Sequence, residues 1–151
     1  MARVAIQEAA FDLGSETAAL TAGRTDVGGV ASFVGVCRAD DGLDAMVLEH
    51  YPGMTERAIA RIAAEAEARW PLSGCTVIHR VGRLCPGEPI VLVLTASAHR
   101  IAALESCAFL IDWLKTRAPF WKREDFADGR SRWVDAKAED DAIAARWDGA
   151  A

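Results

Sequence analysis

Two lysines seven residues apart are the first candidates for chemistry in this sequence. They belong to the stretch KTRAPFWKRE, which begins at Lys115 and sets four cations, the others being Arg117, Lys122 and Arg123, against Glu124. Its local charge is therefore +3 in a chain whose net charge is −5. A lysine whose pKa is lowered by burial or by nearby cations can act as a nucleophile or base, and a protonated lysine can hold an anion.

Helix-end electrostatics explain part of this charge cluster. Lys115 and Arg117 fall at the end of a predicted helix, where each cation stabilises the helix by about 0.3 to 1 kcal/mol. Pro119 ends that helix, because the residue before a proline is pushed out of the helical conformation. Lys122 and Arg123 lie beyond the proline, so they need another explanation, such as an anionic ligand.

His99 and Arg100 form a second candidate site, at the junction between a predicted strand and a predicted helix. Free backbone N–H groups and the helix dipole favour an anion at such an N-terminus, and Arg100 adds a bidentate donor. Taken alone, these residues favour the structural alternative, in which His99 caps the helix and Arg100 lies on the surface. The other histidines, His50 and His79, stand on predicted strands and are expected to be structural.

Arg38 is a third candidate, because it stands where a predicted strand runs into a glycine-containing loop. A solvated strand end is the simpler interpretation of Arg38 by itself. Cys37 beside it is either an activated thiol or a packing residue. The four cysteines form no CxxC pair and the three histidines lie far apart, so we expect free thiols, no metal site and no cofactor.

The bulk composition predicts a single domain that spans residues 1–151. Hydrophobic residues make up 52% of the chain, which is enough for one core, and the sequence contains no repeat or linker. A pI near 5.2 argues against general binding to nucleic acid or to an anionic membrane. No stretch reaches the roughly 18 to 20 apolar residues of a membrane span, and the start lacks a signal peptide, so we expect a cytoplasmic protein.

Hydrophobic periodicity predicts an α+β fold, in which strands arrive in hairpin-like pairs with helices between them. Two strands, 30–38 and 44–51, are predicted to form an antiparallel pair. Thr55 is the predicted N-cap of the second helix, and the apolar run 89–97 is predicted to be a central strand. The predicted helices are 13–23, 55–70, 100–117 and 139–147, and the other predicted strands are 75–82, 89–97 and 131–136.

Six short motifs in one order resemble the large, catalytic subunit of molybdopterin synthase. They are FVGVCR, LEHYPGMTE, RWPL, VIHRVGRL with PGE one residue later, SAHR, and LKTRAPFWKRE followed by RWV. The match covers about residues 12–147, and the last motif is the most specific. The resemblance implies an α/β-hammerhead fold with a mainly antiparallel sheet.

The resemblance also implies an activity and its partners. The family converts cyclic pyranopterin monophosphate into molybdopterin by inserting two sulfurs. Each sulfur arrives as a thiocarboxylate on the C-terminal Gly-Gly tail of a small ubiquitin-like subunit. Two large subunits form a homodimer, which binds two small subunits in a heterotetramer. The expected activity is therefore that of a sulfurtransferase in molybdenum cofactor biosynthesis.

Matched residue by residue, the active-site lysines of the family correspond to Lys115 and Lys122. Its substrate-binding residues correspond to both lysines and to Val36, Cys37, Arg38, His99, Arg100, Arg123 and Glu124. This sequence departs from the family in one place. The segment ADDGLDAM, which follows Arg38, is shorter than the usual family loop and lacks its common Asn-x-Gly element.

Two other functions are compatible with the residues alone. A noncatalytic module could capture an acidic or C-terminal peptide in the same basic pocket. Such a module would bind the tail of a partner without making a pterin product. A phosphate-ester enzyme could instead use His99 and Arg100, and it would act on a phosphorylated metabolite without a protein partner.

Overall fold

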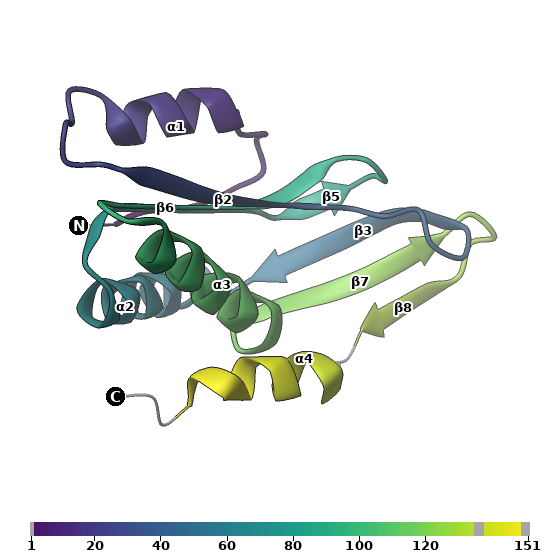
Figure 1. Ribbon diagram of the computed structural model, residues 1–151. Coiled ribbons are helices and arrows are strands. Elements are labelled where there is room, and N and C mark those ends of the chain that lie inside the picture. Colours follow the sequence, from purple (N-terminus) through teal and green to yellow (C-terminus); the bar gives the residue numbers. More distant parts are fainter. Residues whose placement is uncertain (1, 135–137, 149–151) are drawn as a thin grey trace.

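The computed structural model describes residues 2–134 and 138–148, which fold into two four-stranded sheets with helices packed around the first (Figure 1). The first sheet has the order β1 (Arg3–Gln7), β4 (Leu72–Arg80), β6 (Pro89–Ser97), β2 (Gly29–Val36), with β1 parallel to β4 and the other pairs antiparallel. The second sheet has the antiparallel order β5 (Gly82–Leu84), β3 (Leu43–His50), β7 (Phe120–Phe126), β8 (Ser131–Val134). This arrangement confirms the predicted α+β fold class.

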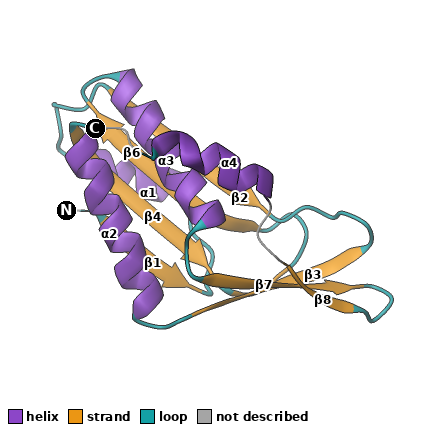
Figure 2. Ribbon diagram, turned by 90° about the horizontal axis from the view of Figure 1, so that it is seen from below, coloured by secondary structure: helices purple, strands orange, loops and turns teal. Residues whose placement is uncertain are grey.

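The helices cover both faces of the first sheet. They are α1 (Leu13–Thr21), α2 (Met54–Arg69), α3 (Arg100–Thr116) and α4 (Ala138–Ala144), and a 3-10 turn, Ala145–Trp147, follows α4. Helix α1 lies on one face, and α2 and α3 lie on the other (Figure 1). Figure 2 shows β3, β7 and β8 extending away from these helices. Among the described residues, no helix combines the length and the apolar character needed to cross a membrane.

Alternating side chains along β4 and β6 fill the space on both faces of the first sheet. Val77 pairs with Val93, and both belong to a core cluster that contains Leu110 of α3. The next pair, Ile78 and Leu92, belongs to a separate cluster on the α1 side, because successive side chains of a strand point to opposite faces. Strand β6 thus has both faces buried and a neighbour on each edge, which confirms its prediction as a central strand.

The predicted pairing of the first two apolar strands is wrong. The strand predicted over 30–38 is β2, which pairs with β6, and the strand predicted over 44–51 is β3, which pairs with β5 and β7. The loop between them therefore carries the chain from one sheet to the other. Its turn residues, Asp41 and Gly42, have φ angles of 50° and 78°. Such residues indicate a turn, but they do not reveal whether the flanking strands pair with each other.

Three strands of the structure, β1, β5 and β7, are missing from the sequence prediction. Strand β5 spans the last residue of the predicted strand 75–82 and the two residues after it. Strand β1 is short and runs parallel to β4, which is distant in sequence. No turn motif near β1 therefore indicates this pairing. Strand β7 contains four consecutive charged residues, 122–125, which hide the apolar alternation of a half-buried strand. Lys122 therefore lies on a strand, in a region where the sequence predicted only a change of direction.

Thr55 is not the N-cap of α2, as the sequence predicted. The helix begins at Met54 with Gly53 as its N-cap, and the Gly53 N–H donates to the Glu56 carboxylate at 2.9 Å. The Thr55 side chain is fully buried instead, and its hydroxyl donates to the carbonyl oxygen of Pro119 at 3.0 Å. Gly53 has a φ of 85°, a conformation that favours glycine at the cap.

The C-terminal segment packs back onto the helices. The predicted helix over 139–147 is α4 followed by the 3-10 turn, and the predicted strand over 131–136 is β8 as far as Val134, with residues 135 and 136 outside the described part. Trp147 makes T-shaped contacts with Trp70 and Phe109, at ring-centroid distances of 5.7 and 5.6 Å. These contacts join α2, α3 and the end of the described chain.

Leu110→Ala should lower the free energy of unfolding by about 2 to 5 kcal/mol, because it leaves a cavity between α3 and the first sheet. Leu110 is 0% exposed, whereas Leu13 on α1 is 40% exposed and supplies a matched leucine deletion. Urea unfolding measures both variants. Equal losses for Leu110→Ala and Leu13→Ala would contradict the placement of Leu110 in the core.

Candidate functional site

Lys115 and Lys122 lie on either side of the turn at Pro119. Lys115 is an exposed residue in the last turn of α3, and Lys122 is a half-buried residue of β7. Helix α3 ends at Thr116, and β7 begins at Phe120 (Figure 1). The predicted break before the proline is therefore confirmed, and it places the two lysines on different elements.

Lys122 lies on the same face of the second sheet as a small buried cluster. It is opposite Leu48 of β3, and directly opposed residues share a face. Leu48 belongs to a cluster with Cys37, Met46 and Leu84. Burial raises the pKa of the Cys37 thiol, and the positive charge of Lys122 has a smaller, opposing effect. Cys37 is thus a packing residue, which favours the structural alternative for it.

His79 packs against Phe120, at the end of the turn between the lysines. Its ring, only 7% exposed, stacks on Phe120 with a centroid distance of 4.0 Å. Its Nδ1 lies 2.8 Å from the carbonyl oxygen of Arg80, which can only accept, so Nδ1 carries the proton. Burial, with a further contribution from the positive charge of Lys115, lowers the pKa of His79 to about 4. The imidazole is therefore neutral at pH 7.

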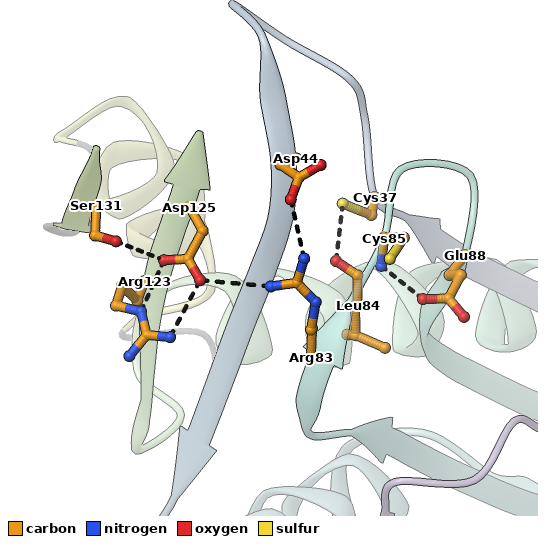
Figure 3. A network of polar contacts seen from close by, with 9 residues as sticks. All are labelled: Cys37, Asp44, Arg83, Leu84, Cys85, Glu88, Arg123, Asp125 and Ser131. Carbon is orange, nitrogen blue, oxygen red and sulfur yellow. Dashed lines mark hydrogen bonds and ion pairs between the residues drawn. The ribbon is translucent and has the colours of Figure 1, made fainter. Parts of the chain in front are cut away.

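Arg123 is matched by a carboxylate on its own strand. It makes a bidentate ion pair with Asp125, at 2.8 and 3.1 Å, and Asp125 also accepts a hydrogen bond from the Ser131 hydroxyl at 2.9 Å. Arg83 of β5 approaches the same carboxylate at 3.6 Å (Figure 3). The hydrogen bonds from Arg123 and Ser131 hold the pKa of Asp125 below its usual range.

The other arginine of the cluster is paired in the same way. Arg117 makes a bidentate ion pair with Asp148, at 2.9 and 2.8 Å, which lowers the pKa of that carboxyl group. Glu124 accepts a hydrogen bond from Arg132 of β8 at 2.7 Å. These contacts give Arg117, Arg123 and Glu124 structural partners.

Backbone hydrogen bonds fix the end of β2 beside the turn that precedes β6. The Cys37 N–H donates to the Glu88 carbonyl at 2.9 Å, and the Gly87 N–H donates to the Cys37 carbonyl at 2.7 Å. Gly87 has a φ of 91°, which this turn needs and other residues rarely adopt. Val36 and Arg38, on either side of the buried cysteine, are exposed. Both side chains are therefore accessible to solvent.

His99 and Arg100 lie at the opposite end of α3 from Lys115. His99 is the N-cap, Arg100 is the first helical residue, and both side chains are exposed. Fifteen residues separate Arg100 from Lys115, which corresponds to roughly 22 Å along a helix. One chain therefore brings the end of β2 together with Lys122, but it does not bring His99 and Arg100 to the lysines.

Comparisons with known proteins identify the family of this chain. The sequence model of the MoaE protein family matches residues 6–117. The chain belongs to the MoaE protein family. The molybdopterin synthase catalytic subunit of Mesorhizobium japonicum is 60% identical over 146 residues, which cover 95% of this chain and 92% of that protein.

Solved structures share the MoaE fold described above. The MoaE protein from Burkholderia ambifaria superposes with a TM-score of 0.84 at 53% identity, over 97% of this chain and 98% of that one. A protein from the complex of subunits 1 and 2 of molybdopterin-converting factor from Helicobacter pylori superposes with a TM-score of 0.73 at 21% identity. That match covers 89% of this chain and 90% of the Helicobacter chain, and it is a likeness of fold.

In this MoaE family member, the short loop after Arg38 is stabilised by contacts between its own residues. Arg38 forms an ion pair with Asp40 at 3.1 Å, and the Leu43 N–H donates to the Asp40 carbonyl at 2.9 Å. The Ala127 N–H donates to the Gly42 carbonyl at 3.1 Å, which anchors the loop beside the end of β7. Within residues 2–134 and 138–148, no group of three or more metal-ligating side chains is gathered.

Three residues near the turn at Pro119 have no sequence signal for that position. His79 and His50 were expected to be structural; in the folded chain, the charge of Lys115 contributes to the lowered pKa of His79, and His50 pairs in register with Phe120. Thr55 reaches the turn between the lysines, as described above. No spacing signal marks these residues, because α2, β3 and β4 bring them together only in the folded chain.

The neutral state of His79 should make stability depend on pH. The folded pKa, about 4, is below the unfolded value near 6.5, so the unfolded state binds a proton that the folded state excludes. Stability is therefore lost as pH falls from 6.5 towards 4. Between pH 7 and pH 4.5, His79→Phe should lose about 2 to 3 kcal/mol less than the original chain.

Urea unfolding at a series of pH values measures this difference. His99→Gln removes an exposed histidine and is the matched control for the loss of one imidazole. If His79→Phe kept the full pH dependence of the original chain, the neutral buried imidazole would not be its source.

Proposed function

We propose that this chain is the catalytic subunit of a molybdopterin synthase, which transfers sulfur to cyclic pyranopterin monophosphate. Membership of the MoaE family supports this activity, because relatives at 60% and 55% identity carry the name molybdopterin synthase catalytic subunit. The observation that carries the proposal is the placement of Lys115 and Lys122 on either side of Pro119, with Lys122 opposite Leu48, which packs in one cluster with Cys37 at the end of β2.

Each group in the proposed reaction needs a cation or a proton at a fixed place. The sulfur donor is a C-terminal thiocarboxylate on a small ubiquitin-like subunit, the substrate carries a cyclic phosphate, and acyl transfer develops negative charge on a carbonyl oxygen. An ammonium group at Lys115 or Lys122 can hold either anion and donate a proton, and a neutral amine can accept one. Residues 36–38 would line the pterin side of the site.

The length of α3 divides the proposed site into two halves. Lys115 and Lys122 lie at one end, whereas His99 and Arg100 lie at the other, roughly 22 Å away. A ligand of pterin size cannot contact both ends of one helix. In a homodimer with a twofold axis, the His99 end of one chain can meet the lysine end of its partner.

The proposed assembly is therefore a homodimer of this chain with one small subunit bound to each copy. The shared fold in the two-subunit complex from Helicobacter pylori supports a partner of this kind. We also propose that residues 1–151 form one domain that acts in the cytoplasm. The four cysteines are free thiols, which persist in a reducing compartment.

Lys115→Ala should lower kcat by at least about 100-fold, because removing one preorganised donor costs roughly 10² to 10³ in rate. The assay combines the purified chain, the thiocarboxylated small subunit and cyclic pyranopterin monophosphate, and it quantifies molybdopterin by mass spectrometry. Lys115→Arg separates charge from amine chemistry. A retained rate means that charge suffices, and a lost rate means that the amine is needed.

Arg61→Ala, which removes an exposed cation of α2, is the control for the loss of a positive charge outside the proposed site. Unchanged turnover by folded Lys115→Ala would remove that residue from the mechanism. An original chain that makes no product with both partners present would overturn the proposed function itself.

If each site takes Lys115 from one chain and Arg100 from its partner, mixing the inactive variants Lys115→Ala and Arg100→Ala should restore activity. In a Lys115→Ala/Arg100→Ala heterodimer, one site loses both residues and the other keeps both. Random exchange in an equal mixture then gives about a quarter of the original turnover, since half of the dimers are mixed and each has one intact site. Turnover is measured after the subunits exchange, and no recovery would place the whole site in one chain.

A further inference from the structure

The hydroxyl of Thr55 joins the turn between the two lysines to a third element. It donates to the Pro119 carbonyl oxygen at 3.0 Å and accepts from the Tyr51 N–H at 2.9 Å. Thr55 is 0% exposed and stands in the first turn of α2, 64 residues before the proline. One buried atom therefore connects the loop before α2 with the break between α3 and β7.

A second contact holds the next residue of the turn. The Phe120 ring stacks on His79, at a centroid distance of 4.0 Å and an interplanar angle of 23°. The Phe120 N–H donates to the Ala118 carbonyl at 2.8 Å. Thr55 thus fixes the carbonyl of Pro119, while His79 on β4 fixes the ring that follows it.

These contacts determine how α3 and β7 meet. Lys115 is four residues before Pro119 on a helix, and Lys122 is three residues after it on a strand, and each element is held by its own backbone hydrogen bonds. The backbone between Thr116 and Phe120 is then the part that sets the relative position of the two amines. A shift of about 1 Å between reacting groups can cost about 100-fold in rate.

We propose that Thr55 is a positioning residue, which fixes the geometry of the Lys115 and Lys122 pair through the Pro119 carbonyl. This inference deepens the proposed function and rests on it for its catalytic consequence. A valine would fill the same volume, but it would leave the Pro119 carbonyl and the Tyr51 N–H without this partner inside the protein. The turn would then relax to satisfy them.

The small number of lysines in this chain makes the geometry directly measurable. The sequence contains three, so reductive methylation with ¹³C-formaldehyde gives three lysine side-chain signals, which Lys→Arg variants assign. Thr55→Val should move the signals of Lys115 and Lys122. Thr55→Ser keeps the hydroxyl and should return both signals to their original positions.

Ser106→Ala is the matched control. Ser106 is also 0% exposed, and its hydroxyl donates to the Ala103 carbonyl at 3.2 Å, in the middle part of α3 and away from Pro119. This variant should leave the Lys115 and Lys122 signals in place. It therefore separates the loss of any buried hydroxyl from the loss of the one at the turn.

Turnover with the thiocarboxylated small subunit gives the second readout. Thr55→Val should lower kcat by about 10- to 100-fold with KM changed by less than about twofold, because the substrate contacts stay and the alignment is lost. Thr55→Ser should keep at least about half of the original kcat. Unchanged kcat per folded molecule in Thr55→Val would show a merely structural role and overturn the inference.

The two readouts fail independently. Unmoved lysine signals in folded Thr55→Val would overturn the role of Thr55 whatever the enzyme does. An inactive original chain would overturn the proposed function, while the spectra, which need no substrate, would still decide the role of Thr55. If Thr55→Val does not fold, Thr55→Ala provides the same comparison, because it also lacks the hydroxyl.

Discussion

The break at Pro119 is the constraint on which the proposed site depends. Proline has no N–H group and excludes the residue before it from the helical conformation, so α3 must end close to Thr116. In an uninterrupted helix, Lys122 would follow Lys115 by about two turns on the same face, roughly 10 Å further along. The break instead places Lys122 in a strand, above the buried cluster that contains Cys37.

Arginine and lysine have different roles around this break. The planar guanidinium groups of Arg117 and Arg123 each bind one carboxylate through two hydrogen bonds, an arrangement that lysine cannot form. The Arg117 pair joins the C-terminal segment to the end of α3, and the Arg123 pair lies within β7. A lysine provides a compact charge and an amine that can lose its proton. The lysines at 115 and 122 are therefore suited to proton transfer or anion binding, whereas the arginines at 117 and 123 are suited to structural ion pairs.

Local sequence patterns predicted the features that depend on neighbouring residues. The helices and the central strand β6 follow from periodicity, and the end of α3 follows from Pro119. The exchange of partners between β2 and β3, and the existence of β1 and β7, depend on contacts between distant segments, where strand preferences are set by the neighbouring strand. Among the candidate site residues, cationic types were visible in sequence. Thr55 and His79 were not, because each acquires its role only by touching the turn at Pro119.

The length of α3 also means that one chain cannot complete the proposed site by itself. Leu110 and Phe109 anchor the helix in the core, so its two ends cannot approach each other without unfolding it. The end that carries Arg100 also exposes Ile101 and Leu104, at 59% and 61%. Exposed apolar side chains beside a cation are expected where a second chain packs. In the proposed dimer, the contact that covers these side chains also delivers Arg100 to the lysines of the partner, so assembly and completion of the site are a single event.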